Sequence, residues 1–535
     1  MKRYSLYLIN PKRKYRYPWD LKEISRIMGR KTAVHPLALP TIAALTPDHY
    51  DVRIIDEEIE PLPNNHLPDL VGITAMIPNI SRAYEIADHY RALGVPVVMG
   101  GPQVSYNVEE TLRHADSVVI GEAEDTWQLC LEDFERGSLK PTYHSEKRPA
   151  FQEGAIPRWD LVDTAKVMAL GVQASRGCPY ACDFCLVPNL FGKRQRYRRL
   201  ENVVAEIKSL PKKQITFVDD NLTADKAYAR TLMEELKPLG VSWACQASFD
   251  LIDHPDLIRH MAAAGCHSIL FGIESVNPAS IEEAHKRQNK IARYEEGIRL
   301  VHSMGIHVIA SFIVGFDSDT LQAFDDIYNF CARNHISLIQ LNILIAYPGT
   351  NLYERLKPMQ RLNPIDPDLL NGIYPTLQFN NMSQTELYHR YFETLGRIFS
   401  FDHVRKKITT ILSSGVFKRE NTGDITVRDK FTSVAHLLSM YLFTLDRSRR
   451  QLLLDLFKLV RNDVTTMNVI VEFLLFISSF HGYLKYTRKH GPAILETIQQ
   501  YDRGPWRHQF AATAGQSDSC ECEALNKASS NLDGN

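Results

Sequence analysis

Short apolar runs alternate with helical segments over most of the chain, and this alternation limits the fold more than any other feature of the sequence. The runs are rich in Val and Ile and nearly continuous in hydrophobicity, as expected for parallel strands buried on both faces. Alternation of strands and helices predicts an α/β fold. A first series of strands is expected at residues 4–10, 50–56, 70–76, 95–101 and 116–122, and a second at 168–175, 214–220, 241–249, 267–275, 307–316 and 337–347.

The two series predict two α/β domains, followed by a helical one. Residues 1–140 are expected to form a Rossmann-like, doubly wound domain, whose ligand would lie outside the carboxyl ends of its strands. A polar linker, residues 141–165, leads to six βα units at 166–380, which predict a partial (β/α)6 barrel because eight units make a complete one. Apolar residues at helical spacing predict a C-terminal helical domain at 381–512. The polar tail, 513–535, is expected to be disordered.

Three cysteines lie in the loop that follows the first strand of the second series. Cys178, Cys182 and Cys185 have the spacing C-x3-C-x2-C, at the end of a strand where barrels carry their reactive groups. Three thiolates are one too few for a closed zinc site, whereas on a four-iron cluster they leave one iron open to a small molecule. The spacing alone leaves open a zinc site with a distant fourth ligand, such as Cys520 or Cys522 of the tail, or three core cysteines without a metal.

The cysteine motif resembles the signature of radical S-adenosylmethionine enzymes, because an aromatic residue, Phe184, precedes the third cysteine. The Rossmann-like domain ahead of the barrel resembles the cobalamin-binding subfamily, which includes hopanoid methylases and the anaerobic magnesium-protoporphyrin cyclase. The segments "FGKRQRYRRLENVVAEI", "ITFVDDN", "FGIES" and "AYPGTNLYERL" are also similar to that subfamily. The resemblance covers roughly residues 1–400. It implies a [4Fe-4S] cluster, S-adenosylmethionine and cobalamin as cofactors, and reductive cleavage of S-adenosylmethionine to a 5′-deoxyadenosyl radical.

The resemblance also implies which residues bind the first two cofactors. Cys178, Cys182 and Cys185 match the cluster ligands. Phe184 matches the aromatic residue that packs beside the cluster and the adenine. Glu274, at the end of the fourth barrel strand, would hold the ribose or methionine part. The further candidates for S-adenosylmethionine are Asp219, Gln246, Ser311 and Gly315. The glycine would allow close backbone approach, while the three polar residues would equally suit hydrogen bonds within the barrel end. No catalytic residue is predicted.

Cobalamin is expected at the carboxyl edge of the N-terminal sheet. The candidate contacts are Thr74, Ala75, Gly100, Gly101, Gly121 and Glu122. Many cobalamin domains carry an Asp-x-His-x-x-Gly loop whose histidine binds cobalt from below. Glu58 occupies that histidine position here, so no lower histidine ligand is predicted. The alternative is a Rossmann-like scaffold that binds no cofactor.

The resemblance implies an enzyme, and we expect a cobalamin-dependent methyltransferase acting on an unactivated carbon of a small or hydrophobic metabolite. The helical domain would determine which one. A radical cyclase or oxidoreductase without methyl transfer is the alternative within this subfamily. A tRNA methylthiotransferase would need three further N-terminal cysteines, but the first cysteine is Cys130. A non-catalytic metal-binding protein is the alternative from another class.

Charge and hydropathy limit the partners. The net charge of -1 gives no reason to expect nucleic acid, and the basic run Lys193–Arg199 is expected to be solvated or to contact cobalamin or substrate carboxylates. The apolar run 467–480 is too short to span a membrane, so we expect a buried helix, or peripheral lipid contact. Nine cysteines are too sparse for a disulfide scaffold. We therefore expect a cytoplasmic protein that receives electrons from a flavodoxin or ferredoxin.

Overall fold

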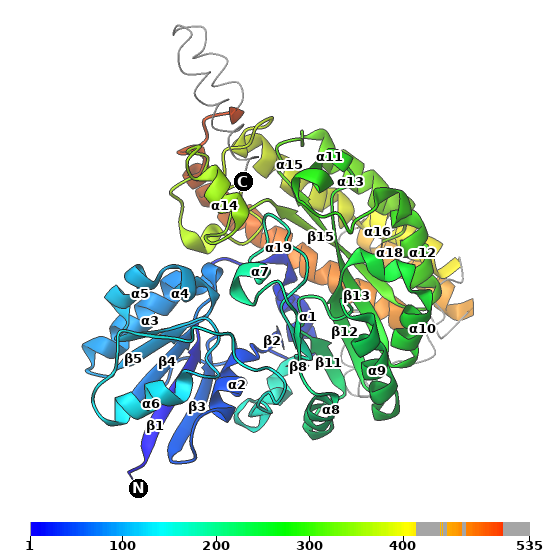
Figure 1. Ribbon diagram of the computed structural model, residues 1–535. Helices are drawn as coiled ribbons and strands as arrows, with labels where there is room; N and C mark the ends of the chain where they lie inside the picture. The colour runs from blue at the N-terminus through cyan, green and yellow to red at the C-terminus, as the bar shows by residue number, and fades with distance from the viewer. Residues whose placement is uncertain are drawn as a thin grey trace, which may run out of the picture.

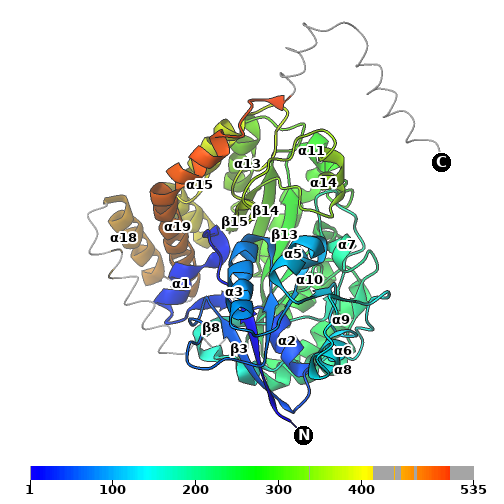
Figure 2. The ribbon, with the colours of Figure 1, turned by 90° about the vertical axis from the view of Figure 1, so that its left-hand side faces the viewer.

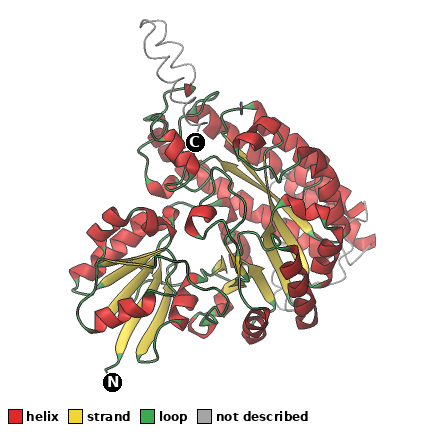
Figure 3. Cartoon of the chain, viewed as in Figure 1, coloured by secondary structure: helices red, strands yellow, loops and turns green. Residues whose placement is uncertain are grey.

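The computed structural model describes residues 2–336, 338–413, 439, 441, 447–462 and 467–506. Two parallel sheets, each covered by helices, dominate it (Figures 1 and 3). The first sheet has the order β3-β1-β4-β5-β6-β7. Its strands are β1 (Tyr4–Asn10), β3 (Tyr50–Asp56), β4 (Leu70–Thr74), β5 (Val97–Gly100), β6 (Ser117–Ile120) and β7 (Thr142–His144). The first five confirm the predicted strands, whereas β7 lies in the stretch predicted to be a linker.

The first sheet is doubly wound, as predicted. Side chains alternate along its strands, so that Leu6 and Leu8 of β1 join one hydrophobic cluster and Tyr7 and Ile9 join another on the opposite face. The covering helices are α2 (Ala38–Ala44), α3 (Ile80–Ala92), α4 (Pro102–Tyr106), α5 (Val108–His114) and α6 (Trp127–Glu135). The strand order reverses beside β1, and the crevice at the carboxyl ends of such a switch is where doubly wound sheets bind ligands.

The second sheet confirms the predicted partial barrel and adds one strand to it. Its order is β15-β14-β13-β12-β11-β8-β2, all parallel. The strands are β2 (Thr32–Val34), β8 (Val167–Val172), β11 (Gln214–Phe217), β12 (Ser242–Ala247), β13 (Cys266–Glu274), β14 (His307–Val314) and β15 (Leu338–Ile343). The added strand, β2, comes from the N-terminal part of the chain. It pairs with β8 through Thr32↔Val167 and Val34↔Ala169.

The barrel wall separates a packed outer face from a more open inner face. On β14, Val308, Ala310 and Phe312 are fully buried, while Ile309 and Ser311 between them are half-buried. The outer helices and connections are α7 (Val187–Leu190), α8 (Leu200–Ser209), α9 (Lys226–Leu236), α10 (Pro255–Ala263), α11 (Pro278–Glu283), α12 (Tyr294–Ser303), α13 (Gln322–Arg333), α14 (Asn351–Leu356) and α15 (Gln384–Ile398). The inner face is therefore where a ligand of the barrel can lie.

The C-terminal region is helical, as predicted. It comprises α16 (Phe401–Ser413), α18 (Arg447–Asn462) and α19 (Met467–Gln499), and α19 lies beside α1 (Lys22–Ile27) (Figure 2). Phe473, Leu474 and Ile477 of α19 are buried together with Ile24 and Ile27 of α1, which confirms a buried helix for the apolar run. No helix in the described ranges is long and apolar enough to cross a bilayer. The predicted tail, 513–535, lies outside these ranges.

Candidate functional site

The cysteine loop leaves the barrel after β8 and is closed by a two-stranded antiparallel pair. Its strands are β9 (Ser175–Arg176) and β10 (Arg196–Tyr197). Gly177 has a φ of 92°, and a Cβ there would lie 3.0 Å from the carbonyl oxygen of Gly192 and 3.2 Å from that of Arg194. A larger residue would therefore push the returning chain away from the first cysteine.

The three thiols of this loop are half-buried and free. Burial raises the pKa of Cys178 and of Cys182, and it raises that of Cys185 to about 12. Across the described residues, no three His, Cys, Asp or Glu side chains are grouped as ligands of one metal ion. Three thiols from one loop are the soft donor set that iron–sulfur clusters use, so the chemistry of the donors fits a cluster.

A buried lysine, Lys286, faces this loop, and it is not among the predicted site residues. Burial alone would lower its pKa, but Glu274 and the thiols of Cys182 and Cys185 raise it, and the net shift is upward. Its Nζ donates a hydrogen bond to Oε1 of Glu274. Beside it, Nε2 of Gln288 lies 4.0 Å from Sγ of Cys182. The run "HKRQNK" (285–290) resembles a solvated turn, so only the three-dimensional fold places a cation here.

Glu274 ends β13 in an unusual backbone conformation. Its φ is 62°, in a region that non-glycine residues seldom adopt and that clusters at functional sites. Nδ2 of Asn289 donates to the carbonyl oxygens of Gly272 and Ile273, at 2.9 and 3.0 Å, and the hydroxyl of Tyr294 donates to the latter at 3.1 Å. These bonds hold the strand end in place while the Glu274 carboxylate pairs with Lys286.

Asp219 and Asp220 follow β11 and hold the start of the cysteine loop. The carboxylate of Asp219 is fully buried and accepts hydrogen bonds from the backbone N–H of Ala174, at 3.1 Å, and from the N–H and Oγ of Ser175. Burial raises the pKa of Asp219 to about 7. Oδ2 of Asp220 accepts from the N–H of Gly177 at 3.2 Å. Both carboxylate oxygens of Asp219 are therefore bonded to the residues that lead into the cysteine loop. Contact of Asp219 with S-adenosylmethionine stays a prediction.

Two of the other predicted residues lie on the inner face of the barrel. Gln246 is exposed between the buried Cys245 and Ala247, and Oγ of Ser311 accepts from Nδ2 of Asn342 at 3.3 Å. Both are therefore placed where a ligand inside the barrel could reach them.

Gly315 and Phe184 contact aromatic neighbours. Gly315 has a φ of 118°, and a Cβ there would lie 2.6 Å from the ring of Phe379. The glycine thus makes room for that ring, and an approach by a cofactor stays a prediction. The ring of Phe184 lies edge-on to that of Phe316, with the centroids 6.3 Å apart. This contact fixes the side chain between the second and third cysteines.

The carboxyl edge of the N-terminal sheet has a surface of backbone and small side chains. The N–H of Ala75 donates to the carbonyl oxygen of Gly100 at 2.9 Å. A Cβ on Gly101 would lie 2.6 Å from the carbonyl oxygen of Ala75 and 3.2 Å from Oγ1 of Thr74. Gly121, with a φ of 78°, donates to Oγ of Ser105 at 2.9 Å and has open space beside it. Such a surface allows a large planar cofactor to approach the backbone.

Glu122 joins this edge to the cysteine loop. Its side chain is 4% exposed and pairs with Arg176 of β9 and Arg196 of β10. Arg176 also pairs with Glu124, at 2.7 Å. The acidic turn after β6 and the basic pair that closes the cysteine loop therefore form one charged network between the two domains. Both carboxylate oxygens of Glu122 are bonded to arginines. Contact of this residue with cobalamin stays a prediction.

Glu58 has partners of its own. Its carboxylate lies 3.0 Å from Nζ of Lys22 and accepts a hydrogen bond from the N–H of Arg13 at 3.3 Å. Oδ2 of the neighbouring Asp56 lies 3.7 Å from Nε2 of the buried His35. The loop in which other cobalamin domains carry a histidine ligand is thus joined here to the segment that leads into the barrel.

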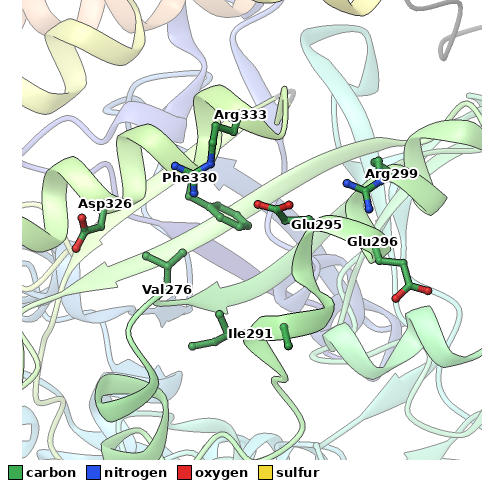
Figure 4. Close-up of a pocket in the computed structure, with 9 residues that line it drawn as sticks. Val276, Ile291, Glu295, Glu296, Arg299, Asp326, Phe330 and Arg333 are labelled. Carbon is green, nitrogen blue, oxygen red and sulfur yellow. The ribbon is translucent and has the colours of Figure 1, made fainter.

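Two cavities lie outside the inner face. The larger, about 770 Å³, is a groove on the outside of the barrel between α12 and α13, with the apolar residues Val276, Ile291 and Phe330 beneath charged ones (Figure 4). The smaller, about 260 Å³, lies between the carboxyl edge of the N-terminal sheet, at Ser105 and Gly121, and α7, at Asn189 and Leu190. The smaller cavity therefore adjoins both the cysteine loop and the carboxyl edge of the N-terminal sheet, where cobalamin is expected.

Comparison with known proteins identifies both domains. Residues 172–331 match the radical SAM superfamily and residues 29–131 match the B12 binding domain. An uncharacterized methyltransferase of Pyrococcus horikoshii is 32% identical over 373 residues, which cover 62% of this chain and 80% of that protein. The chain belongs to the cobalamin-binding radical S-adenosylmethionine enzymes. This confirms the resemblance, an enzymatic function and the three predicted cofactors.

Two further relatives support the family. The bacteriochlorophyllide d C-8(2)-methyltransferase of Chlorobaculum tepidum is 26% identical over 412 residues, covering 72% of this chain and 91% of that protein. The solved structure of the cobalamin-dependent S-adenosylmethionine radical enzyme OxsB, with aqua-cobalamin and S-adenosylmethionine bound, has a TM-score of 0.57 and 15% identity. It covers 91% of this chain and 84% of OxsB. This radical enzyme therefore shares its fold with OxsB across most of both chains.

Proposed function

We propose that this radical enzyme transfers a methyl group to an unactivated carbon of a hydrophobic metabolite. The observation that carries the proposal is the charged network of Glu122, Arg176 and Arg196, which joins the cobalamin edge directly to the cysteine loop. When bound, the cluster and S-adenosylmethionine supply the radical chemistry, and cobalamin carries the methyl group. The two reactive centres must lie close together for one substrate carbon to meet both, and this network supports such an arrangement.

The barrel residues would hold the cluster and S-adenosylmethionine. Cys178, Cys182 and Cys185 would bind the cluster, and Lys286 beside them would offset the negative charge of the thiolates. Glu274 would contact the ribose or methionine part, while Gln246 and Ser311 face the interior, where the rest of the molecule would lie. Asp219 would act indirectly, because it holds the backbone of Ala174 and Ser175, which precede the first cysteine.

The N-terminal sheet would hold cobalamin without a protein ligand below the cobalt. Glu58 is bonded to Lys22, and no histidine stands in its place. Binding would rest instead on the close backbone surface of Thr74, Ala75, Gly100 and Gly101. The opening beside Gly121 would admit part of the cofactor.

The proposed substrate class rests on a relative and on the aromatic residues at the barrel. The chain spans 91% of a methyltransferase named for bacteriochlorophyllide d. Here the hydroxyl of Tyr17 accepts a hydrogen bond from Nε2 of Gln340 on β15, at 2.6 Å, and the ring of Phe379 lies against Gly315. Aromatic side chains thus flank the inner face, and these suit a large apolar metabolite. We also propose a cytoplasmic enzyme, since thiol ligands need a reducing compartment, with a flavodoxin or ferredoxin as electron donor.

Anaerobic reconstitution tests the proposal. The protein would be loaded with iron, sulfide and cobalamin, reduced with dithionite, and given S-adenosylmethionine with a deuterated methyl group and bacteriochlorophyllide d. We expect 5′-deoxyadenosine and a labelled product from the wild type, and neither from Cys182→Ala. The control, Cys130→Ala, removes a buried thiol of α6 outside the loop and should keep the activity. No 5′-deoxyadenosine from fully loaded wild type would refute radical cleavage.

The alternative, ring closure or oxidation without methyl transfer, is distinguished in the same reaction. It would give 5′-deoxyadenosine together with an oxidised substrate that carries no label. That outcome would keep the radical chemistry and refute methyl transfer.

A further inference from the structure

We propose that Lys193 and Arg194 form the docking surface for an acidic one-electron carrier, of the flavodoxin or ferredoxin class. The inference rests on the proposed function, because it presumes a cluster on the three cysteines that an outside donor must reduce. It assigns a role to part of the basic run Lys193–Arg199, for which a solvated face or a contact with cobalamin or substrate carboxylates was expected.

The structure divides this basic run into inward and outward residues. Arg196 is bonded to Glu122 at the domain interface, and Arg198 forms a buried pair with Glu206. Arg199 lies 3.1 Å from Glu153 at the surface. Lys193 and Arg194 are exposed and have no ion-pair partner among the described residues. Their charges are therefore available to another molecule.

The outward pair lies directly behind the cysteine loop. The carbonyl oxygens of Gly192 and Arg194 lie within about 3 Å of the position that a Cβ on Gly177 would occupy, and Gly177 precedes Cys178. One layer of backbone therefore separates this surface from the loop. Electron transfer weakens steeply with distance, and the opposite side of the loop faces the barrel interior, where S-adenosylmethionine is proposed to bind. A protein donor would approach most closely from the surface of Lys193 and Arg194.

Neighbouring charges strengthen the positive field. Lys147 and Arg148 are also exposed, and a Cβ on Gly192 would lie 3.1 Å from Cζ of Arg148, which places that guanidinium beside the pair. The exposed Glu146 precedes Lys147 in the chain, so these four cations outnumber the carboxylate next to them. On a chain with a net charge of -1, such an excess favours an acidic partner through electrostatic steering. Figure 2 shows α7, which directly precedes this surface, at the edge of the molecule.

The transfer itself moves one electron and no atoms. The carrier is oxidised by one electron, and the cluster is reduced by one electron to the state that cleaves S-adenosylmethionine. A small reductant such as dithionite needs no docking surface. The structure therefore predicts that loss of these charges slows the carrier and leaves dithionite unaffected.

The test compares two reductants on two charge-reversed variants of the loaded enzyme. Lys193→Glu with Arg194→Glu removes the surface. The control, Lys237→Glu with Arg259→Glu, reverses two exposed cations near α9 and on α10, which Figure 1 shows on the far side of the barrel from α7. With purified flavodoxin hydroquinone at low ionic strength, we expect cluster reduction to slow by about tenfold to a hundredfold in the first variant. The control should match the wild type.

Three outcomes would overturn the inference. These are an unchanged rate with flavodoxin, an equal loss in the control, and an equal loss with dithionite, which would mean that the segment supports the cluster rather than the carrier. Failure of the proposed function would look different, because wild type would then form no 5′-deoxyadenosine even with dithionite. Raising the salt concentration should slow the wild type with flavodoxin toward the rate of the variant.

Discussion

The ammonium of Lys286 and the carboxylate of Glu274 form a buried ion pair at the carboxyl end of the barrel. Both side chains are shielded from solvent, and the glutamate adopts a positive φ that is costly for a residue with a side chain. The pair joins β13 to the loop that faces the cysteines. It therefore connects the expected ribose or methionine contact with the charge of the cluster ligands.

Loss of the lysine should damage both stability and cleavage. In Lys286→Met the carboxylate of Glu274 stays buried without its partner, which typically costs about 3–5 kcal/mol. We expect a lower apparent free energy of unfolding in denaturant, and little 5′-deoxyadenosine. Lys290→Met, an exposed lysine of the same loop, should change neither. A Lys286→Met enzyme as stable and active as the wild type would contradict a paired, functional lysine.

A side chain at Gly272 should displace the ion pair, because the ends of the Glu274 and Lys286 side chains occupy the space beside it. A Cβ there would come within 2.4 Å of both Oε1 of Glu274 and Nζ of Lys286. We expect Gly272→Ala to cost about 1–3 kcal/mol, as overpacking does, and to weaken binding of S-adenosylmethionine in an equilibrium titration. Gly396→Ala, in the interior of α15 with open space around it, should instead stabilise by about 0.5–1 kcal/mol. Equal effects of the two substitutions would argue against the geometry at Gly272.

The network between the domains should matter more for methyl transfer than for cleavage. Glu122→Gln leaves Arg196 without its carboxylate, and a hydrogen bond to a charged group contributes about 1.5–3 kcal/mol. We expect more 5′-deoxyadenosine for each labelled product, because the two cofactor sites would be held less firmly. Glu109→Gln, at an exposed pair with Arg113, should leave this ratio unchanged. An unchanged ratio in Glu122→Gln would show that the network does not position the domains for the reaction.

Asp219 should make the fold more stable as the pH falls toward neutrality and below. Its pKa in the folded protein is about 7, above the ordinary 3.8, so between these values the folded state binds a proton that the unfolded chain does not. The contribution to the free energy of unfolding thus rises as the pH falls through 7, by about 1 kcal/mol between pH 8 and pH 6. Denaturant titrations should show this gain for the wild type and not for Asp219→Asn. Parallel pH profiles of the two proteins would contradict it.

Most of the barrel strands were predictable because apolar residues predominate in them. Ser242–Ala247 has four apolar residues out of six, and His307–Val314 has six out of eight. The strand Thr32–Val34 has three residues and follows a charged stretch, so no local pattern distinguishes it from a loop, and only its pairing with β8 makes it a strand.

Positions at the candidate site were easier to predict than their partners. Glu122 and Asp219 stand at strand ends, as the sequence indicates, but their oxygens are bonded to Arg176 and to Ser175. Those bonds depend on how a distant loop folds back, which spacing does not reveal. Lys286 was missed for the same reason, because it lies in a polar run far along the chain from the cysteines that it faces.

The pairing of β2 with β8 determines how this protein can be divided. The chain begins in the first sheet, crosses to the barrel through α1 and β2, and returns to complete the first sheet with β3. A cut at residue 140 would therefore remove the edge strand of the barrel together with the corrinoid module. Exchanging that module with another enzyme's while keeping β2 would require one junction on each side of residues 21–37 and a third after β7, because the two domains are interwoven along the chain.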